Sequence, residues 1–434
     1  MQRREWKFRV AELNSTTMLL LDIRVCEQKK FVMLPSKAAG SKQTAARLRY
    51  AHGIAGRVSL MTPPCREWVN ASIRRIEMER TRCAETHLLK VELPSMPGLT
   101  LYLKDETTHL TGSLKHRLAR SLFLYALCNG RIGPNSTVVE ASSGSTAVSE
   151  AYFARLLGLR FVAVMPRTTT AEKQAEIVAN GGEVHLVDEP GEIYAAAIRI
   201  ADETGGCYLD QFTFAERAVD WRVDNIAQSI FHQMSEEEHR VPTWVVCGAG
   251  TGGTAATIGR YIRYRGLTTR LCLADPVESV YHRHMADRNV RTWRGRSVIE
   301  GIGRPQVEAS FVADLIERTI AVPDAASIAA ARVMSRFIGR SCGGSTGTNL
   351  WASLLIMQEM AAAGERGALV TILCDSGERY RSTLFEDTWL AKRKLSCAPY
   401  QRQLEAMLAV PDVSSDPARP EPIQAPPPRA RVGG

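Results

Sequence analysis

Long apolar runs are missing from this sequence. The apolar run near the start of the chain, Met18-Leu19-Leu20-Leu21, is far shorter than the roughly 20 residues that a membrane-spanning helix needs. No secretory signal with a convincing cleavage site is present either. The ten cysteines form no CxxC pair and no His/Cys cluster with zinc-ligand spacing. We therefore expect a cytoplasmic protein with reduced cysteines, no metal site and no membrane partner.

An excess of charge of one sign is also missing from most of the chain. Residues 1–60 contain 12 Lys/Arg and 4 Asp/Glu, a net charge of +8, which leaves only +1 of the total of +9 for everything that follows. The body of the protein is therefore almost neutral. This distribution argues against a nucleic-acid partner.

The pattern along the chain predicts an α/β protein. Short β-rich runs such as Val138-Glu140 and Val245-Cys247 alternate with segments of helical spacing, which is typical of parallel sheets flanked by helices. The first 60 residues lack sustained periodicity, so we expect a leader of residues 1–65 that is disordered or not translated. Seven prolines among residues 411–434 predict a disordered tail, which we place at residues 399–434.

Lys115 lies where a Gly/Ser turn leads into a helix, in the run Thr111-Gly112-Ser113-Leu114-Lys115-His116-Arg117. Burial and the positive end of the helix dipole both favour the neutral, nucleophilic amine. Such a lysine can form an imine with an aldehyde cofactor. A solvated surface lysine is the alternative on this heptapeptide alone. We expect the nearby His109 and His116 to be packing residues, and the acidic pair Asp105-Glu106 to lie in a solvated turn.

Three further turns, each between a strand and a helix or at a helix start, carry polar or glycine-rich sequences. Residues 141–146 (ASSGST) offer hydroxyls and backbone N–H groups to an anion, although simple N-capping is the alternative. Residues 248–254 (GAGTGGT) can cradle a phosphate. They also satisfy GxGxxG, with Asp275 ending the next strand, so a nicotinamide-binding fold is the rival interpretation. Residues 342–348 (CGGSTGT) form another such turn, for which a helix cap is the alternative.

Seven motifs in order resemble the cysteine synthase and cystathionine β-synthase family of fold type II pyridoxal phosphate enzymes, which is tryptophan synthase β-like in fold. They are TGSLKHR at 111–117, ASSGST at 141–146, Gln211-Phe212, GTGGT at 250–254, EGIG at 300–303, GGSTG at 343–347 and DSGERY at 375–380. The resemblance covers about residues 66–395. It implies two three-layer domains with mostly parallel sheets. The large domain would comprise residues 66–104 and 216–398, and the small mobile domain residues 105–215.

The resemblance also implies roles for individual residues. Lys115 would be the lysine that bonds pyridoxal 5'-phosphate, and Ser345 the partner of the pyridine nitrogen. The cofactor phosphate would bind to Gly250, Thr251, Gly252, Gly253 and Thr254. The amino acid carboxylate would bind to Ser142, Ser143, Thr146 and Gln211.

One departure from the family bears on the reaction. Ser145, expected to bind the cofactor, stands where cysteine synthases carry asparagine, and its short side chain would need a bridging water to reach the cofactor's phenolic oxygen. The sequence looks closest to the L-cysteine desulfhydrase branch, in which cysteine is split to hydrogen sulfide, pyruvate and ammonia. A cysteine synthase acting on O-acetylserine and sulfide is the alternative, and a nicotinamide-dependent oxidoreductase a remote one. The family also implies a homodimer.

Overall fold

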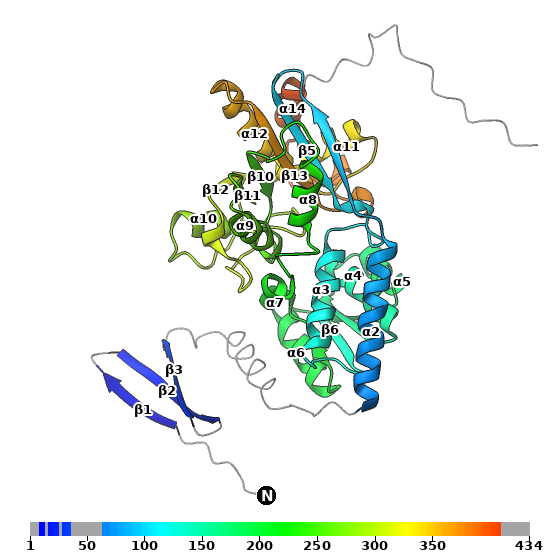
Figure 1. The fold of residues 1–434 in the computed structure, drawn as a ribbon, viewed down its shortest axis with the longest axis vertical. Helices are drawn as coiled ribbons and strands as arrows, with labels where there is room; N and C mark the ends of the chain where they lie inside the picture. Colours follow the sequence, from blue (N-terminus) through cyan, green and yellow to red (C-terminus); the bar gives the residue numbers. More distant parts are fainter. Residues whose placement is uncertain (1–7, 14–15, 26–27, 36–62, 409–434) are drawn as a thin grey trace, which may run out of the picture.

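The computed structural model describes residues 8–13, 16–25, 28–35 and 63–408, with side chains described from residue 65 onward. Two sheets with their helices form two lobes, one above the other in Figure 1. This arrangement confirms the α/β fold with mostly parallel sheets that the sequence predicts. Among the described helices, none is long and apolar enough to span a bilayer.

The large lobe is built on a six-stranded sheet of order β12-β11-β10-β13-β5-β4. All neighbouring pairs are parallel except β4 and β5. Its strands are β4 (His87–Glu92), β5 (Leu99–Asp105), β10 (Trp244–Cys247), β11 (Arg270–Pro276), β12 (Arg318–Val322) and β13 (Gly367–Leu373). Its helices are α8 (Ile226–Met234), α9 (Gly253–Arg265), α10 (Tyr281–Ala286), α11 (Asp324–Ile338), α12 (Gly344–Ala362), α13 (Asp387–Lys392) and α14 (Ala398–Leu408).

Alternation along the strands produces the three layers of this lobe, because successive side chains point to opposite faces of a sheet. On strand β10, Val246 packs with α11, α12 and α14 in one apolar cluster. Its neighbours Val245 and Cys247 pack with α8, α9 and α10 in another. Helices therefore cover both faces of the sheet, as parallel sheets require.

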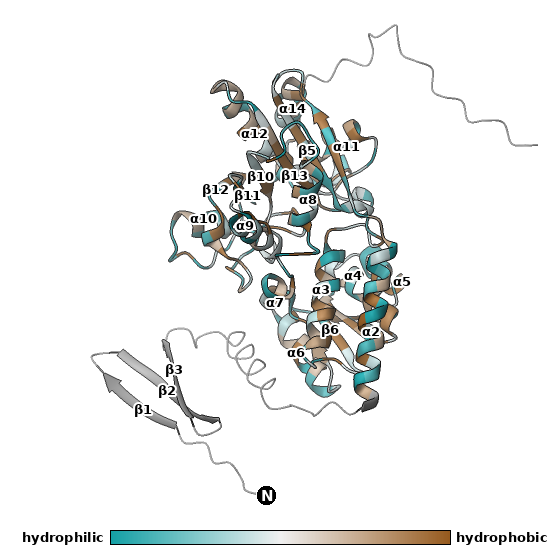
Figure 2. Cartoon of the chain, in the orientation of Figure 1, coloured by the Kyte–Doolittle hydropathy of each residue, from teal (hydrophilic) through white to brown (hydrophobic). Residues whose placement is uncertain are grey.

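The small lobe holds a parallel sheet of order β8-β7-β6-β9. Its strands are β6 (Thr137–Ala141), β7 (Arg160–Pro166), β8 (Glu183–Val187) and β9 (Cys207–Tyr208), and its helices are α3 (Lys115–Cys128), α4 (Ser145–Leu157), α5 (Ala171–Ala179), α6 (Ile193–Glu203) and α7 (Gln211–Ala218). Helix α6 lies on one face of the sheet, and α3 and α4 lie on the other. Figure 2 shows apolar colouring along β6, in keeping with a strand that is buried on both faces.

Helix α2 (Pro63–Arg82) belongs with the small lobe, whereas the predicted boundary assigned residues 66–104 to the large domain. Val69 and Ile76 of α2 lie in the same apolar cluster as Leu122 of α3 and Phe153 of α4. The strands β4 and β5, which follow α2, belong to the large sheet. The chain therefore crosses between the lobes after α2 and again after β5.

Both chain ends differ from the sequence prediction. Within the predicted leader, the backbone forms a three-stranded antiparallel sheet of β1 (Phe8–Leu13), β2 (Thr16–Val25) and β3 (Gln28–Pro35). At the other end, helix α14 (Ala398–Leu408) includes all of residues 399–408, for which the sequence predicts disorder. Its Leu404, Met407 and Leu408 are buried in the large-lobe core, at the spacing of one helical face. The remainder of the leader and of the Pro-rich tail lies outside the described residues.

Candidate active site

Lys115 is the first residue of helix α3 and lies in the cleft between the lobes. Its backbone N–H donates to the Ser113 Oγ at 3.2 Å, within the turn that precedes the helix. The preceding turn is joined to the end of strand β13, because Leu114 N–H donates to the Cys374 carbonyl at 2.8 Å. Burial lowers the pKa of the Lys115 amine, and the nearby Cys374 and Asp375 oppose that shift without cancelling it. The neutral amine expected from the sequence is therefore favoured by its surroundings.

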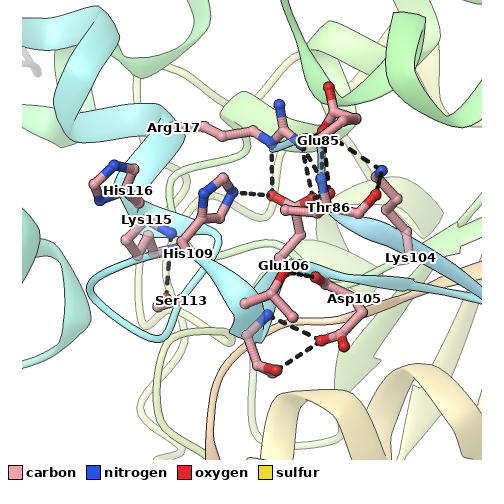
Figure 3. Close-up of polar contacts among 12 residues, drawn as sticks. Glu85, Thr86, Lys104, Asp105, Glu106, His109, Ser113, Lys115, His116 and Arg117 are labelled. Carbon is pink, nitrogen blue, oxygen red and sulfur yellow. Dashed lines mark hydrogen bonds and ion pairs between the residues drawn. The ribbon is translucent and has the colours of Figure 1, made fainter. Parts of the chain in front are cut away.

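A network of buried ionic groups holds the start of α3 against strand β5 (Figure 3). Arg117 donates from Nε to the Glu106 Oε2 at 2.6 Å, and His109 Nε2 lies 2.9 Å from the same oxygen. Thr86 donates its hydroxyl to the Glu106 Oε1 at 2.7 Å. Burial alone would raise the pKa of Glu106, but Arg117 and His109 outweigh burial and hold that pKa below its ordinary value. The prediction that Asp105 and Glu106 lie in a solvated turn is wrong, since both are buried.

His116 is a packing residue, as expected. Its Nε2 lies 2.9 Å from Glu79 Oε1 on α2, and its Nδ1 lies 3.1 Å from the hydroxyl of Thr111. Its ring also stacks on that of His109, with centroids 5.1 Å apart. Both ring nitrogens are thus engaged away from the cleft.

The glycine-rich loop lies at the carboxyl end of strand β10 and leads into helix α9, which starts at Gly253. Gly252 has a φ of +90°, a left-handed conformation that side chains disfavour. A Cβ at Gly250 would come within 2.2 Å of the Gly301 carbonyl oxygen, so the loop packs against the second glycine motif at 300–303. Backbone N–H groups at a helix start, with no side chains in the way, suit a phosphate. The loop therefore fits the cofactor phosphate.

Ser345 lies in the first turn of helix α12, in the same pocket as Lys115 and Gly250. The polar side chains of Asn349 and Asp375 also line this pocket. Asn349 Oδ1 and Asp375 Oδ1 are buried and have no hydrogen-bond partner among the described residues. Polar atoms of this kind suit a pocket that receives a polar heteroaromatic ring.

The predicted carboxylate-binding residues line a second cavity of about 590 Å³ that also includes Lys115. Thr146 donates its hydroxyl to Gln211 Oε1 at 2.9 Å, which leaves the Gln211 amide N–H groups as donors. Ser142 and Ser143 border the cavity just before α4, so the positive end of that helix faces it. All four residues predicted to bind the substrate are thus on one cavity wall.

Ser145 has partners that sequence reasoning missed. Its Oγ contacts Arg379 Nη1 and lies 3.5 Å from Asp375 Oδ2. Arg379 also donates to Glu176 on α5 at 2.6 Å, so the arginine links the two lobes beside the cleft. Asp375 and Arg379 belong to a motif that the sequence did single out, but no role was assigned to them, because their approach to Ser145 depends on how the lobes meet.

Asp275, the residue on which a nicotinamide-binding interpretation depended, is held at the start of helix α10. It is buried at the end of β11 and accepts hydrogen bonds from the backbone N–H of His282 at 2.9 Å. Its role is to fix the start of α10.

A helix-start lysine, a glycine-rich phosphate cradle and a serine in one pocket between two α/β lobes define a pyridoxal phosphate enzyme of the fold type II class. The comparison with known families agrees: residues 80–375 match the family described as pyridoxal-phosphate dependent enzyme, and the chain belongs to that family. Its cofactor is pyridoxal 5'-phosphate. The nicotinamide-dependent alternative is thereby set aside.

Individual proteins with similar sequences or structures indicate which enzymes of this family the chain resembles. The chain is 58% identical, over 339 residues, to the L-cysteine desulfhydrase Cds1 of Mycobacterium tuberculosis, covering 77% of this chain and 92% of that protein. It is 28% identical to cysteine synthase B of Pseudomonas aeruginosa, covering 69% of this chain and 93% of the relative. Among solved structures, an O-ureido-L-serine synthase is similar with a TM-score of 0.63 and 25% identity, covering 74% of this chain and 98% of that one.

Proposed function

We propose that the protein splits L-cysteine by β-elimination into hydrogen sulfide, pyruvate and ammonia. The observation that carries this proposal is the 58% identity to an L-cysteine desulfhydrase across nearly the whole of that relative. The departure at Ser145 supports the same choice, because a cysteine synthase of this family carries asparagine there. Lys115, Ser345 and the ASSGST loop supply the chemical groups that such a reaction needs.

Pyridoxal phosphate supplies an aldehyde that captures amines and a conjugated ring that accepts electrons when a bond at the substrate Cα breaks. Lys115 would bind that aldehyde, and the loop from Gly250 to Thr254 would hold the phosphate. Ser345 would face the pyridine nitrogen. A serine hydroxyl cannot protonate this nitrogen fully as a carboxylic acid would, which limits charge in the ring and favours loss of a β-substituent over transamination.

Lys115 would also move the proton. When it is not bonded to the aldehyde, its ε-amine would take the proton from the substrate Cα. A base must be neutral to do so, and burial lowers the pKa of the Lys115 amine below its ordinary value. The sulfur group at Cβ then leaves as sulfide.

The substrate carboxylate would bind at the start of α4. Ser142, Ser143 and Thr146 present hydroxyls there, and Gln211 presents its amide N–H groups because its oxygen already accepts from Thr146. A carboxylate fixed at this point would hold the substrate in the cavity that Lys115 also lines. The loop would therefore contribute by positioning the substrate, and it adds no charged side chain.

Cysteine synthase is the second candidate, supported by the relatedness to cysteine synthase B. Two assays on the purified enzyme separate the candidates: release of sulfide and pyruvate from L-cysteine, and formation of cysteine from O-acetylserine with sulfide. We expect the first rate to exceed the second. A synthase rate far above the rate of sulfide release would contradict the proposal.

Lys115→Ala provides the matched test of the catalytic group. We expect a loss of sulfide release of roughly 10²–10⁴-fold, the usual contribution of a positioned base. Lys392→Ala, at an exposed position on α13, is the control that should leave the rate unchanged. Full activity in the Lys115 variant would rule out this active site.

The assembly and location of the protein belong to the same proposal. We propose a homodimer in the cytoplasm that acts on a small amino acid and binds no nucleic acid. All nine cysteines among the described residues are free thiols, which is consistent with a reducing compartment. Sedimentation equilibrium of the purified chain measures the oligomeric state directly.

A further inference from the structure

One cation stands beside the loop that would bind the substrate carboxylate. The ASSGST loop and Gln211 offer only neutral hydroxyl, amide and backbone hydrogens. Arg379, in the short helix η5 (Gly377–Tyr380) of the large lobe, lines the same cavity as these residues and Lys115. The proposed function leaves this arginine without a role.

The guanidinium of Arg379 is held on two sides. Its Nη2 donates to Glu176 Oε1 of helix α5 at 2.6 Å, and its Nη1 contacts the hydroxyl oxygen of Ser145. Ser145 is the first residue of α4 and stands directly before Thr146, one of the residues proposed to bind the carboxylate. The Nη1 end of the guanidinium is therefore at the ASSGST loop, whereas Nη2 is turned to Glu176.

The surroundings of Arg379 favour its attraction for an anion. Only 10% of its side chain is exposed, so solvent screens its charge less than it would at the surface. Two carboxyl groups compete for this charge. Glu176 is 32% exposed and is therefore partly screened. The other is Asp375, whose Oδ2 lies 3.5 Å from Ser145 Oγ; burial raises its pKa, which favours the uncharged acid and weakens its competition.

We propose that Arg379 binds the substrate carboxylate together with the ASSGST loop and thereby selects α-amino acids over simple amines. The inference rests on the carboxylate site of the proposed function. An arginine can donate two N–H groups to one carboxylate, and hydrogen bonds between charged partners are roughly twice as strong as those between neutral ones. The carboxylate would share the Nη1 group with Ser145.

Arg379 also has a competing, purely structural interpretation. Because Arg379 belongs to the large lobe and Glu176 to the small lobe, their ion pair joins the lobes. A residue that only joined the lobes would affect every ligand of the cleft alike and would need Glu176. A carboxylate-binding residue would affect only ligands that carry a carboxylate, and Glu176 would compete with them.

Two ligands that cannot undergo elimination separate these interpretations. L-alanine carries an amine and a carboxylate, and ethylamine is the matched amine that lacks the carboxylate. Both are titrated into the holoenzyme, and the visible absorption of the bound cofactor reports the dissociation constant. The variants are Arg379→Met, Arg379→Lys and Glu176→Gln. Arg381→Met is the matched control, because Arg381 lies two residues farther along the chain and is exposed.

We expect Arg379→Met to weaken L-alanine binding roughly 10-fold to 100-fold, the range of a hydrogen bond to a charged group, and to leave ethylamine binding unchanged. Arg379→Lys keeps the charge but loses the two-pronged geometry, so its loss should be smaller. Glu176→Gln removes the competing carboxylate and should tighten L-alanine binding roughly twofold to fivefold, the range of a partly exposed ion pair. Arg381→Met should change neither dissociation constant.

Two results would overturn the carboxylate role. One is unchanged L-alanine binding in Arg379→Met, or an equal weakening of L-alanine and ethylamine, which would favour the structural interpretation. The other is weaker L-alanine binding in Glu176→Gln, because a lost contact between the lobes and a lost competitor change the dissociation constant in opposite directions. The Glu176 variant therefore decides the question even if Arg379→Met folds poorly.

These titrations separate the inference from the proposed function. Neither ligand releases sulfide, so an enzyme that binds the cofactor but does not split cysteine still reports on Arg379. In an enzyme that does split cysteine, Arg379→Met should raise KM for L-cysteine with little change in kcat, as expected for an interaction that the ground state and the transition state share. A fall in kcat with an unchanged KM would contradict the carboxylate role.

Discussion

Single residues of the active site could be predicted where a motif fixes both their type and their backbone position. Lys115, Ser345 and the loop from Gly250 to Thr254 all follow or begin a regular element, and the structure brings them to one pocket. Burial was harder to predict. Asp105 and Glu106 are adjacent charges in sequence, yet both are buried, because each pairs with an arginine from another part of the chain: Arg340 for Asp105 and Arg117 for Glu106.

Glu150 on α4 gives a residue-scale prediction about stability. It is buried, and neither carboxyl oxygen has a hydrogen-bond partner in the part of the chain that the structure describes. Burial, and next the nearby Glu140, raise its pKa well above the ordinary 4.5, so the folded state holds a proton that the unfolded state releases. The contribution of Glu150 to stability is therefore full below about pH 4.5 and declines by about 1.4 kcal/mol per pH unit as pH rises toward the folded pKa.

Glu150→Met should remove this penalty while keeping the size of the side chain. The expected result is a gain in the free energy of unfolding at pH 8 that shrinks toward pH 5, measured by urea denaturation at both values. Glu203→Met, at an exposed position on α6, is the control and should change stability by less than about 0.5 kcal/mol at either pH. A loss of stability at pH 8 in Glu150→Met would show that the carboxyl group is paired in solution.

At the scale of elements, most strands and helices of the body could be predicted from alternating β-rich and helical patterns. For two helices, α2 and α14, the sequence pattern predicts the wrong packing partners. Helix α2 was placed with the strands that follow it, because sequence order gives no information on which lobe a helix packs against. Helix α14 was merged into the Pro-rich tail, although Leu404, Met407 and Leu408 have the spacing of a buried helical face.

Leu404→Ala tests whether α14 is part of the core. Leu404 is fully buried in the cluster that contains α11 and α12, so the substitution should cost about 2–5 kcal/mol in the free energy of unfolding. Gln403→Ala, on the exposed face of the same helix, serves as the control and should cost little. Equal unfolding midpoints for the two variants would mean that α14 is not docked.

At the scale of the whole molecule, the active site exists only where the two lobes meet. The small lobe provides Lys115 and the carboxylate loop, and the large lobe provides the phosphate cradle and Ser345. Polar pairs cross between the lobes beside the cavity, including Lys173 with Glu300 at 2.5 Å. Motifs could predict each wall of this cleft, but not the pairs that join the walls, because those depend on the relative placement of two separate sheets.

The proposed active site depends on one particular amine, that of Lys115, as the group that bonds the cofactor. Borohydride reduction of the purified holoenzyme, followed by digestion and mass spectrometry, locates the pyridoxyl group on a peptide. Lys104 is a built-in comparison, since it is also a buried lysine whose pKa burial lowers, to about 8, but it is held by the Thr86 carbonyl and Gln233 outside the cleft. We expect the pyridoxyl mass on Lys115 alone; finding it on Lys104 or another lysine, or on none, would show that Lys115 does not bond the cofactor.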